Sequence, residues 1–142
     1  MSGFVVDASV AIKWFLAEAH SREADTLLAT GEPLYAPDLL LAECGNILWK
    51  RADRGELRAD RALAILDALR DSALDIKPAT PLLSEAFTIA HRHRRSFYDS
   101  LYLALAQAMD APLITADLRL YNALKDSQLA KHIRWIETLE LS

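Results

Sequence analysis

Short apolar runs alternate with longer amphipathic segments along almost the whole chain. The mainly apolar runs contain three or four residues, too few for a helix, and they predict buried strands. These runs lie at residues 4–6, 34–36, 74–76, 112–115 and 133–136. Between them, apolar residues recur at the three- and four-residue spacing of a helix. The predicted helices span about residues 9–17, 21–30, 38–53, 59–71, 81–91, 96–109 and 118–124.

This alternation of strands and helices predicts a fold of the α/β class. Strands that are apolar throughout, with a helix between each pair, are typical of a parallel sheet covered on both faces. The chain of 142 residues has no internal repeat, no low-complexity segment and no long linker. We therefore expect one domain over residues 1–142, a three-layer α/β/α sandwich with a short, mainly parallel central sheet.

Composition narrows the class of protein further. The hydrophobic fraction of 52% argues against disorder, and no apolar run approaches the roughly 18 residues of a membrane span. The N-terminus lacks the features of a signal peptide. The single cysteine, Cys44, excludes an internal disulfide and fits a reducing, cytoplasmic setting. A net charge of −4 counts against binding nucleic acid by bulk charge, but it permits a local basic surface.

Four acidic residues stand in or beside apolar surroundings, where a lone carboxylate is costly to bury. Asp7 ends the first strand, Asp117 follows the fourth, and the other two are Glu43 and Asp99 on predicted helices. In parallel sheets the functional site lies beyond the carboxyl ends of the strands. We therefore expect all four carboxylates to converge at that edge.

Helix capping is the alternative explanation for three of the acids. Asp7 and Asp117 both precede predicted helices, although Ser9 could cap the first helix in place of Asp7. Ser96 and Asp99 have the spacing of a capping box. Glu43 has no capping role because it lies well inside its helix, where the alternative is a buried ion pair with an Arg or Lys.

Crowded carboxylates indicate a bound cation, because without one they repel each other. Oxygen ligands suit Mg²⁺, with Mn²⁺ as a second choice, and such a centre can activate water to hydrolyse a phosphodiester. Asn46 shares a helical face with Glu43 and could hold a carboxylate or a metal-bound water. Two other functions remain open: a phosphatase of the haloacid-dehalogenase type with Asp7 as nucleophile, and a non-catalytic interaction module that merely holds a cation.

Four segments of the chain together resemble the PIN-domain ribonucleases, and in particular the VapC-type toxins of prokaryotic toxin–antitoxin pairs. The segments are residues 5–9 (VVDAS), 37–43 (PDLLLAE), 98–106 (YDSLYLALA) and 113–117 (LITAD). Each segment is weak alone, but their order and separations match over nearly the whole chain.

The resemblance implies a metal-dependent endoribonuclease with a PIN-like α/β/α fold. Asp7, Glu43, Asp99 and Asp117 match the four acidic positions of the family. Ser9 matches a hydroxyl position near the metal, and Thr115 is a further hydroxyl close to it. The resemblance also implies RNA as substrate, a cognate antitoxin that blocks the active site, and a homodimer.

Basic residues form two local groups that could meet RNA phosphates or an antitoxin's carboxylates. One is the run 91–95 (HRHRR), and the other comprises Lys50, Arg51 and Arg54 at a helix end, where cations also suit the helix dipole. Lys13 lies one turn after Ser9 and could approach the site. Nothing in the spacing supports Cys44 as a nucleophile, and we expect it to be a small core residue.

Overall fold

The central sheet has five strands, all parallel, in the order β3-β2-β1-β4-β5. The computed structural model describes residues 3–141. Each strand spans only three or four residues: β1 (Phe4–Val6), β2 (Leu34–Pro37), β3 (Asp75–Lys77), β4 (Leu113–Thr115) and β5 (Ile133–Trp135). The chain builds outward from β1 to β3, returns past β1 to β4 and continues to β5, so the strand order reverses between β1 and β4.

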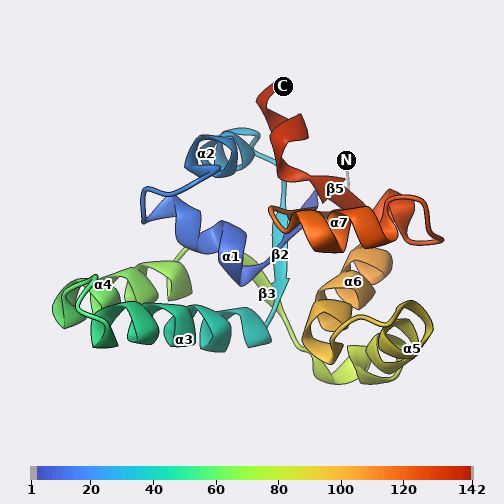
Figure 1. Cartoon of the computed structure of the whole chain (residues 1–142), viewed down its shortest axis with the longest axis horizontal. Helices are drawn as coiled ribbons and strands as arrows, with labels where there is room; N and C mark the ends of the chain where they lie inside the picture. Colours follow the sequence, from blue (N-terminus) through green and yellow to red (C-terminus); the bar gives the residue numbers. More distant parts are fainter. Residues whose placement is uncertain (1–2, 142) are drawn as a thin grey trace.

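Seven α-helices connect and cover the strands. They are α1 (Ala8–Ala11), α2 (Ser21–Ala29), α3 (Leu39–Asp53), α4 (Ala59–Arg70), α5 (Leu83–His93), α6 (Phe97–Met109) and α7 (Leu118–Leu124). Residues 3–141 also contain four short 3₁₀ segments: η1 (Ile12–Trp14), η2 (Thr80–Leu82), η3 (Ala130–His132) and η4 (Ile136–Leu141). Figure 1 shows α1 to α4 on one side of the sheet and α5 to α7 on the other, which confirms the predicted three layers.

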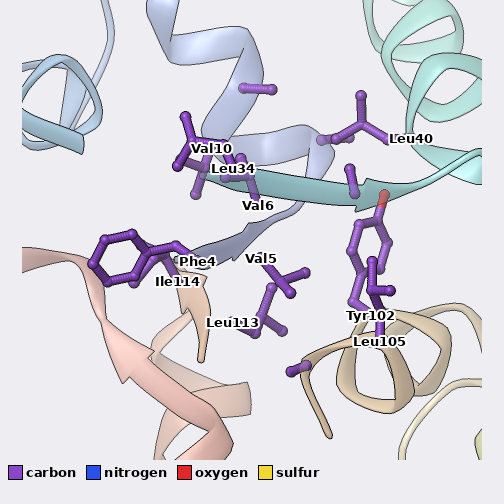
Figure 2. Close-up of a cluster of buried hydrophobic side chains, with 14 of the residues drawn as sticks. Phe4, Val5, Val6, Val10, Leu34, Leu40, Tyr102, Leu105, Leu113 and Ile114 are labelled. Atoms are coloured by element: carbon purple, nitrogen blue, oxygen red, sulfur yellow. The ribbon is translucent and has the colours of Figure 1, made fainter. Parts of the chain in front are cut away.

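The core lies on both faces of the sheet, as the apolar central strands β1, β2 and β4 predict. Val5 pairs in register with Leu113, and Figure 2 shows both side chains on the same side of the sheet as Leu105 of α6. Val6 lies on the opposite side, near Val10 of α1. All three residues of β1 are buried because helices cover both faces of this central strand.

The structure differs from the sequence prediction mainly after the first strand. The single helix expected over residues 9–17 is a four-residue α1 followed by the 3₁₀ turn η1. Tertiary contacts end it early: the Trp14 indole nitrogen donates to the Ala24 carbonyl, and the Ser21 hydroxyl donates to the Leu16 carbonyl. These bonds tie the segment to α2, which a local helical pattern cannot foresee.

The sequence also led to expectations about membrane spans and about Cys44. Among these residues, no helix has both the length and the apolar character needed to span a membrane. Cys44 of α3 is a free thiol buried in the hydrophobic core of the protein.

Candidate active site

A cleft of about 440 Å³ opens at the carboxyl ends of the central strands, where the strand order reverses. Such a switch point is where open parallel sheets bind ligands, because the connections leave β1 and β4 in opposite directions. All four predicted acidic residues line this cleft. Its lining residues are Asp7, Ala8, Ser9, Lys13, Glu43, Asn46, Ile47, Asp99, Tyr102, Ala116, Asp117 and Leu120.

Asp7 follows β1 directly and is the N-cap of α1. Its Oδ1 atom accepts hydrogen bonds from the Val10 backbone N–H at 3.0 Å and from the Ser9 hydroxyl at 2.8 Å. Of the two candidate caps, Asp7 is therefore the one that caps α1, and Ser9 supports its carboxylate. Capping occupies one carboxylate oxygen, and no hydrogen bond from the described residues engages Oδ2.

Asp117, which lies just after β4, also caps the helix that follows it. Its Oδ1 atom accepts from the backbone N–H groups of Arg119 and Leu120, at 3.0 and 3.2 Å, and so caps α7. Thr115 is fully buried and does not line the cleft; its hydroxyl instead accepts the Asp117 backbone N–H at 3.0 Å. Thr115 thus holds the backbone from which the Asp117 carboxylate projects.

Asp99 lies in the first turn of α6, with its backbone held by Ser96. The Ser96 hydroxyl is the N-cap acceptor for the Asp99 N–H at 3.0 Å, as the capping-box spacing predicts. The Asp99 carboxylate lines the cleft. A position near a helix N-terminus also favours its negative charge.

Glu43 reaches the cleft from the second turn of α3, and its partner is Tyr102 of α6. The Tyr102 hydroxyl donates to Glu43 Oε1 at 2.5 Å. In Figure 2 this hydroxyl points away from α6, toward the side of the sheet where α3 lies. The alternative of a buried ion pair is not supported, because no Lys or Arg of the described chain pairs with Glu43. Asn46 is exposed and lines the cleft one turn after Glu43.

The sequence interpretation missed Tyr102 as a site residue. The available signal was its position three residues after Asp99, which puts both side chains on one face of α6. A tyrosine inside an apolar helix reads as core, and the ring of Tyr102 is indeed buried. The partner of this hydroxyl is visible only in the tertiary structure, where α6 and α3 lie on opposite sides of the sheet.

The clustered carboxylates hold their protons more tightly than free ones. Burial raises the pKa of Asp7 to about 6, against the opposing bonds from Ser9 and Val10, and the charges of Asp99 and Glu43 raise it further. Burial and the charge of Asp99 also raise the pKa of Glu43, while the Tyr102 hydrogen bond lowers it. The pKa of Asp99 is raised by burial and by Asp117, although Ser96 and Arg95 oppose this. All three shifts have burial as their largest cause, and neighbouring carboxylates add to it.

Of the basic residues, only some come near this cleft. Lys13 lines it, as its position one turn after Ser9 suggests. None of the run 91–95 lines the cleft, although Arg95 is near enough to lower the pKa of Asp99. Cys44 is a buried core residue, as expected: it does not line the cleft, and burial raises the pKa of its thiol to about 12.

The donors in the cleft suit a hard divalent cation. Carboxylate, hydroxyl and amide oxygens line it, and its lining within the described chain has neither His nor Cys. No group of three or more His, Cys, Asp or Glu side chains among residues 3–141 is arranged so that it could hold a metal ion as it stands. Fold and cleft together define a parallel α/β protein with an acidic, oxygen-lined centre at its switch point.

Comparison with known families identifies this chain. A family model described as "PIN domain" matches residues 4–125, and the chain belongs to the PIN-domain family. The chain is 36% identical over 118 residues to Ribonuclease VapC3 of Pyrobaculum aerophilum, a match that covers 82% of this chain and 90% of that relative.

Solved structures share the fold. The crystal structure of PAE2754 from Pyrobaculum aerophilum matches with a TM-score of 0.73 and 26% identity, over 98% of this chain and 87% of that one. A toxin–antitoxin complex from Klebsiella pneumoniae matches with a TM-score of 0.61 over 86% of this chain and 92% of that one. Its 16% identity supports likeness of fold alone. The predicted PIN-like α/β/α fold is confirmed.

Proposed function

We propose that this protein is a metal-dependent endoribonuclease that hydrolyses phosphodiester bonds in RNA, and that it is the toxin of a toxin–antitoxin pair. Membership of the PIN-domain family and the likeness to a VapC ribonuclease support this activity. One structural observation carries the proposal: Asp7, Glu43, Asp99 and Asp117 come from four separate parts of the chain and line a single cleft.

In this proposal the four carboxylates hold Mg²⁺, or Mn²⁺, and both caps contribute to its placement. Asp7 and Asp117 each have one oxygen fixed by a helix N-terminus, which leaves the other for a cation. A divalent cation supplies Lewis-acid activation of water and stabilises the leaving oxygen. Ser9 and Thr115 orient the two aspartates, Tyr102 orients Glu43, and Asn46 offers an amide at the rim of the cleft.

The partners follow from the same relationships. The matched Klebsiella pneumoniae structure is a toxin–antitoxin complex, and we infer a cognate antitoxin for this chain that covers its active site. A homodimer and a cytoplasmic location complete the proposal. The single thiol, buried in the core, is consistent with a reducing compartment.

The decisive experiment is cleavage of labelled single-stranded and structured RNA by purified, antitoxin-free protein in Mg²⁺, in Mn²⁺ and in EDTA. We expect cleavage with either metal and none in EDTA. Asp7→Asn and Asp99→Asn should each lower the rate at least about 100-fold, because each removes a charge that the cation needs. Lys131→Gln, at an exposed position outside the cleft, is the control and should cleave like the wild type.

Two results would contradict the proposal. Cleavage that survives in EDTA would exclude the metal mechanism, and an Asp7→Asn variant of full activity would remove Asp7 from the site. A covalent aspartyl-phosphate on Asp7, trapped and located by mass spectrometry, would instead support the haloacid-dehalogenase alternative. That alternative gives no role to Glu43, which shares the cleft with Asp7.

A further inference from the structure

One cation faces the acidic cleft, and it belongs to a small cluster of charges at its edge. Among the described residues that line the cleft, Lys13 alone carries a positive charge. Its side chain is 10% exposed, and its ammonium donates to Glu18 Oε1 at 2.9 Å. It does not pair with any of the four cleft carboxylates in the described structure.

Glu18 is shared between two cations. Arg51, in the last turns of α3, donates from Nη2 to Glu18 Oε2 at 2.6 Å. The Glu18 backbone is itself fixed, because its N–H donates to the Ser21 hydroxyl at 3.0 Å. One carboxylate between two cations leaves the cluster of Lys13, Glu18 and Arg51 with a net charge of +1.

An ammonium has three N–H donors, and the described structure engages one of them on Lys13. The bond to Glu18 places the ammonium while leaving the other two donors for a ligand. Glu18 also pairs with Arg51, so its single negative charge does not neutralise Lys13 completely. A cation placed in this way suits an anion that enters the cleft beside the carboxylates.

We propose that Lys13 binds a phosphate oxygen of RNA in the cleft, and that Glu18 and Arg51 are positioning residues that hold its ammonium there. This inference rests on the proposed nuclease function, and it assigns the contact that brings a polyanion into an acidic cleft. A phosphate approaching four carboxylates is repelled, and Lys13 supplies a fixed attraction at the same entrance.

The test measures RNA binding by fluorescence anisotropy in an Asp7→Asn background with Mg²⁺, between about 50 and 200 mM salt. Lys13→Gln should weaken binding about tenfold, the effect of one lost charge-assisted hydrogen bond. The slope of log affinity against log salt should fall in magnitude by about 0.7, the value for one phosphate contact to a single strand. Lys13→Arg should retain both, and Lys131→Gln is the exposed control.

Glu18→Gln separates this role from a structural ion pair. Both Lys13→Gln and Glu18→Gln remove the ion pair and should lower the melting temperature. In Glu18→Gln, however, the amide oxygen can still accept from the Lys13 ammonium and hold it in place, while the cluster charge rises to +2. We expect Glu18→Gln to bind RNA as tightly as its parent or more tightly. In the wild-type background, Lys13→Gln should raise KM about tenfold with little change in kcat.

Each contrary outcome has a distinct meaning. Equal weakening by Lys13→Gln and Glu18→Gln, or an unchanged salt slope in Lys13→Gln, overturns the phosphate contact while the nuclease activity stands. A wild type that neither binds nor cleaves RNA in Mg²⁺ or Mn²⁺ overturns the proposed function and this inference with it.

Discussion

At the scale of single residues, capping a helix and holding a cation are compatible roles. Oδ1 of Asp7 receives the Val10 N–H and the Ser9 hydroxyl, and Oδ1 of Asp117 receives two backbone N–H groups. A carboxylate has two oxygens, so each cap leaves the second one available. The hydrogen bonds that cap the helix also limit the rotation of the carboxylate, which prepares the site at no separate entropic cost.

Tyr102 gives a residue-scale prediction about activity. Tyr102→Phe removes the hydroxyl that donates to Glu43 at 2.5 Å while keeping the buried ring. We expect about a 10-fold loss of kcat, because Glu43 is no longer oriented. The free energy of unfolding should fall by about 1 kcal/mol, because a hydrogen bond is lost. Rates and melting temperatures of the variant and of an exposed control, Tyr98→Phe, check this.

The Tyr102 contact also changes metal affinity in this prediction. Without the hydroxyl, we expect a higher Mg²⁺ concentration for half-maximal rate in Tyr102→Phe. A variant whose rate and Mg²⁺ dependence both equal those of the wild type would show that Glu43 needs no such support.

At the scale of elements, three short connections place the acids. Asp7 joins β1 to α1, Asp117 lies between β4 and α7, and Asp99 opens α6 after its Ser96 cap. Strand ends and helix starts meet at one edge of a parallel sheet, so residues there converge without unusual backbone geometry. The long α3 is the exception, since it brings Glu43 to the cleft from within its second turn.

The Ser96 cap gives an element-scale prediction. Ser96→Ala removes the acceptor for the Asp99 N–H, and we expect a loss of about 1 kcal/mol in unfolding free energy. Activity should also fall several-fold, because the first turn of α6 then frays beneath the Asp99 carboxylate. Chemical denaturation and cleavage rates measure the two effects.

Ser96→Thr is the matched control, since its hydroxyl can cap the same N–H group. A Ser96→Ala variant that is destabilised but fully active would separate the stability of α6 from the placement of Asp99.

At the scale of the whole molecule, the acidic cleft links stability to pH and to metal. Folded Asp7 has a pKa of about 6, above its ordinary value of 3.8, so the folded protein binds more protons than the unfolded chain between these values. Stability must therefore fall as pH rises through this window. The raised pKa values of Glu43 and Asp99 act in the same direction.

In EDTA, we expect the wild type to lose on the order of 2 kcal/mol relative to Asp7→Asn as the pH rises from about 4 to about 6. The asparagine remains neutral throughout, so the difference between the two proteins isolates the carboxylate. Denaturant unfolding at several pH values measures this difference. If the wild type instead gained stability relative to Asp7→Asn as the pH rises, the raised pKa of a buried Asp7 carboxyl would be contradicted.

Mg²⁺ at pH 7 should raise the melting temperature of the wild type more than that of Asp7→Asn, because it binds the native state of the wild type more tightly.

Much of the fold was predictable because its signals are local. Strands β1, β2 and β4 are short apolar runs, and α2, α3, α4, α6 and α7 begin and end within a few residues of the helical patterns. The first predicted helix was too long because the Trp14 and Ser21 hydrogen bonds that end it come from tertiary neighbours. The convergence of the four acids in one cleft was predictable too, because they lie beside strand ends and helix starts that meet at one edge of a parallel sheet.

What the amino-acid sequence determined by itself is the α/β alternation, the acidic residues and their places at strand and helix ends. Only the tertiary structure decided the strand order, and with it the reversal between β1 and β4 that opens the cleft. It also decided the partners, Tyr102 for Glu43 and Glu18 for Lys13, which are 59 and 5 residues apart. Periodicity reports which face of an element is buried, but not which element packs against that face. Contacts between elements depend on their packing as a whole, and so they appear only when the chain is folded.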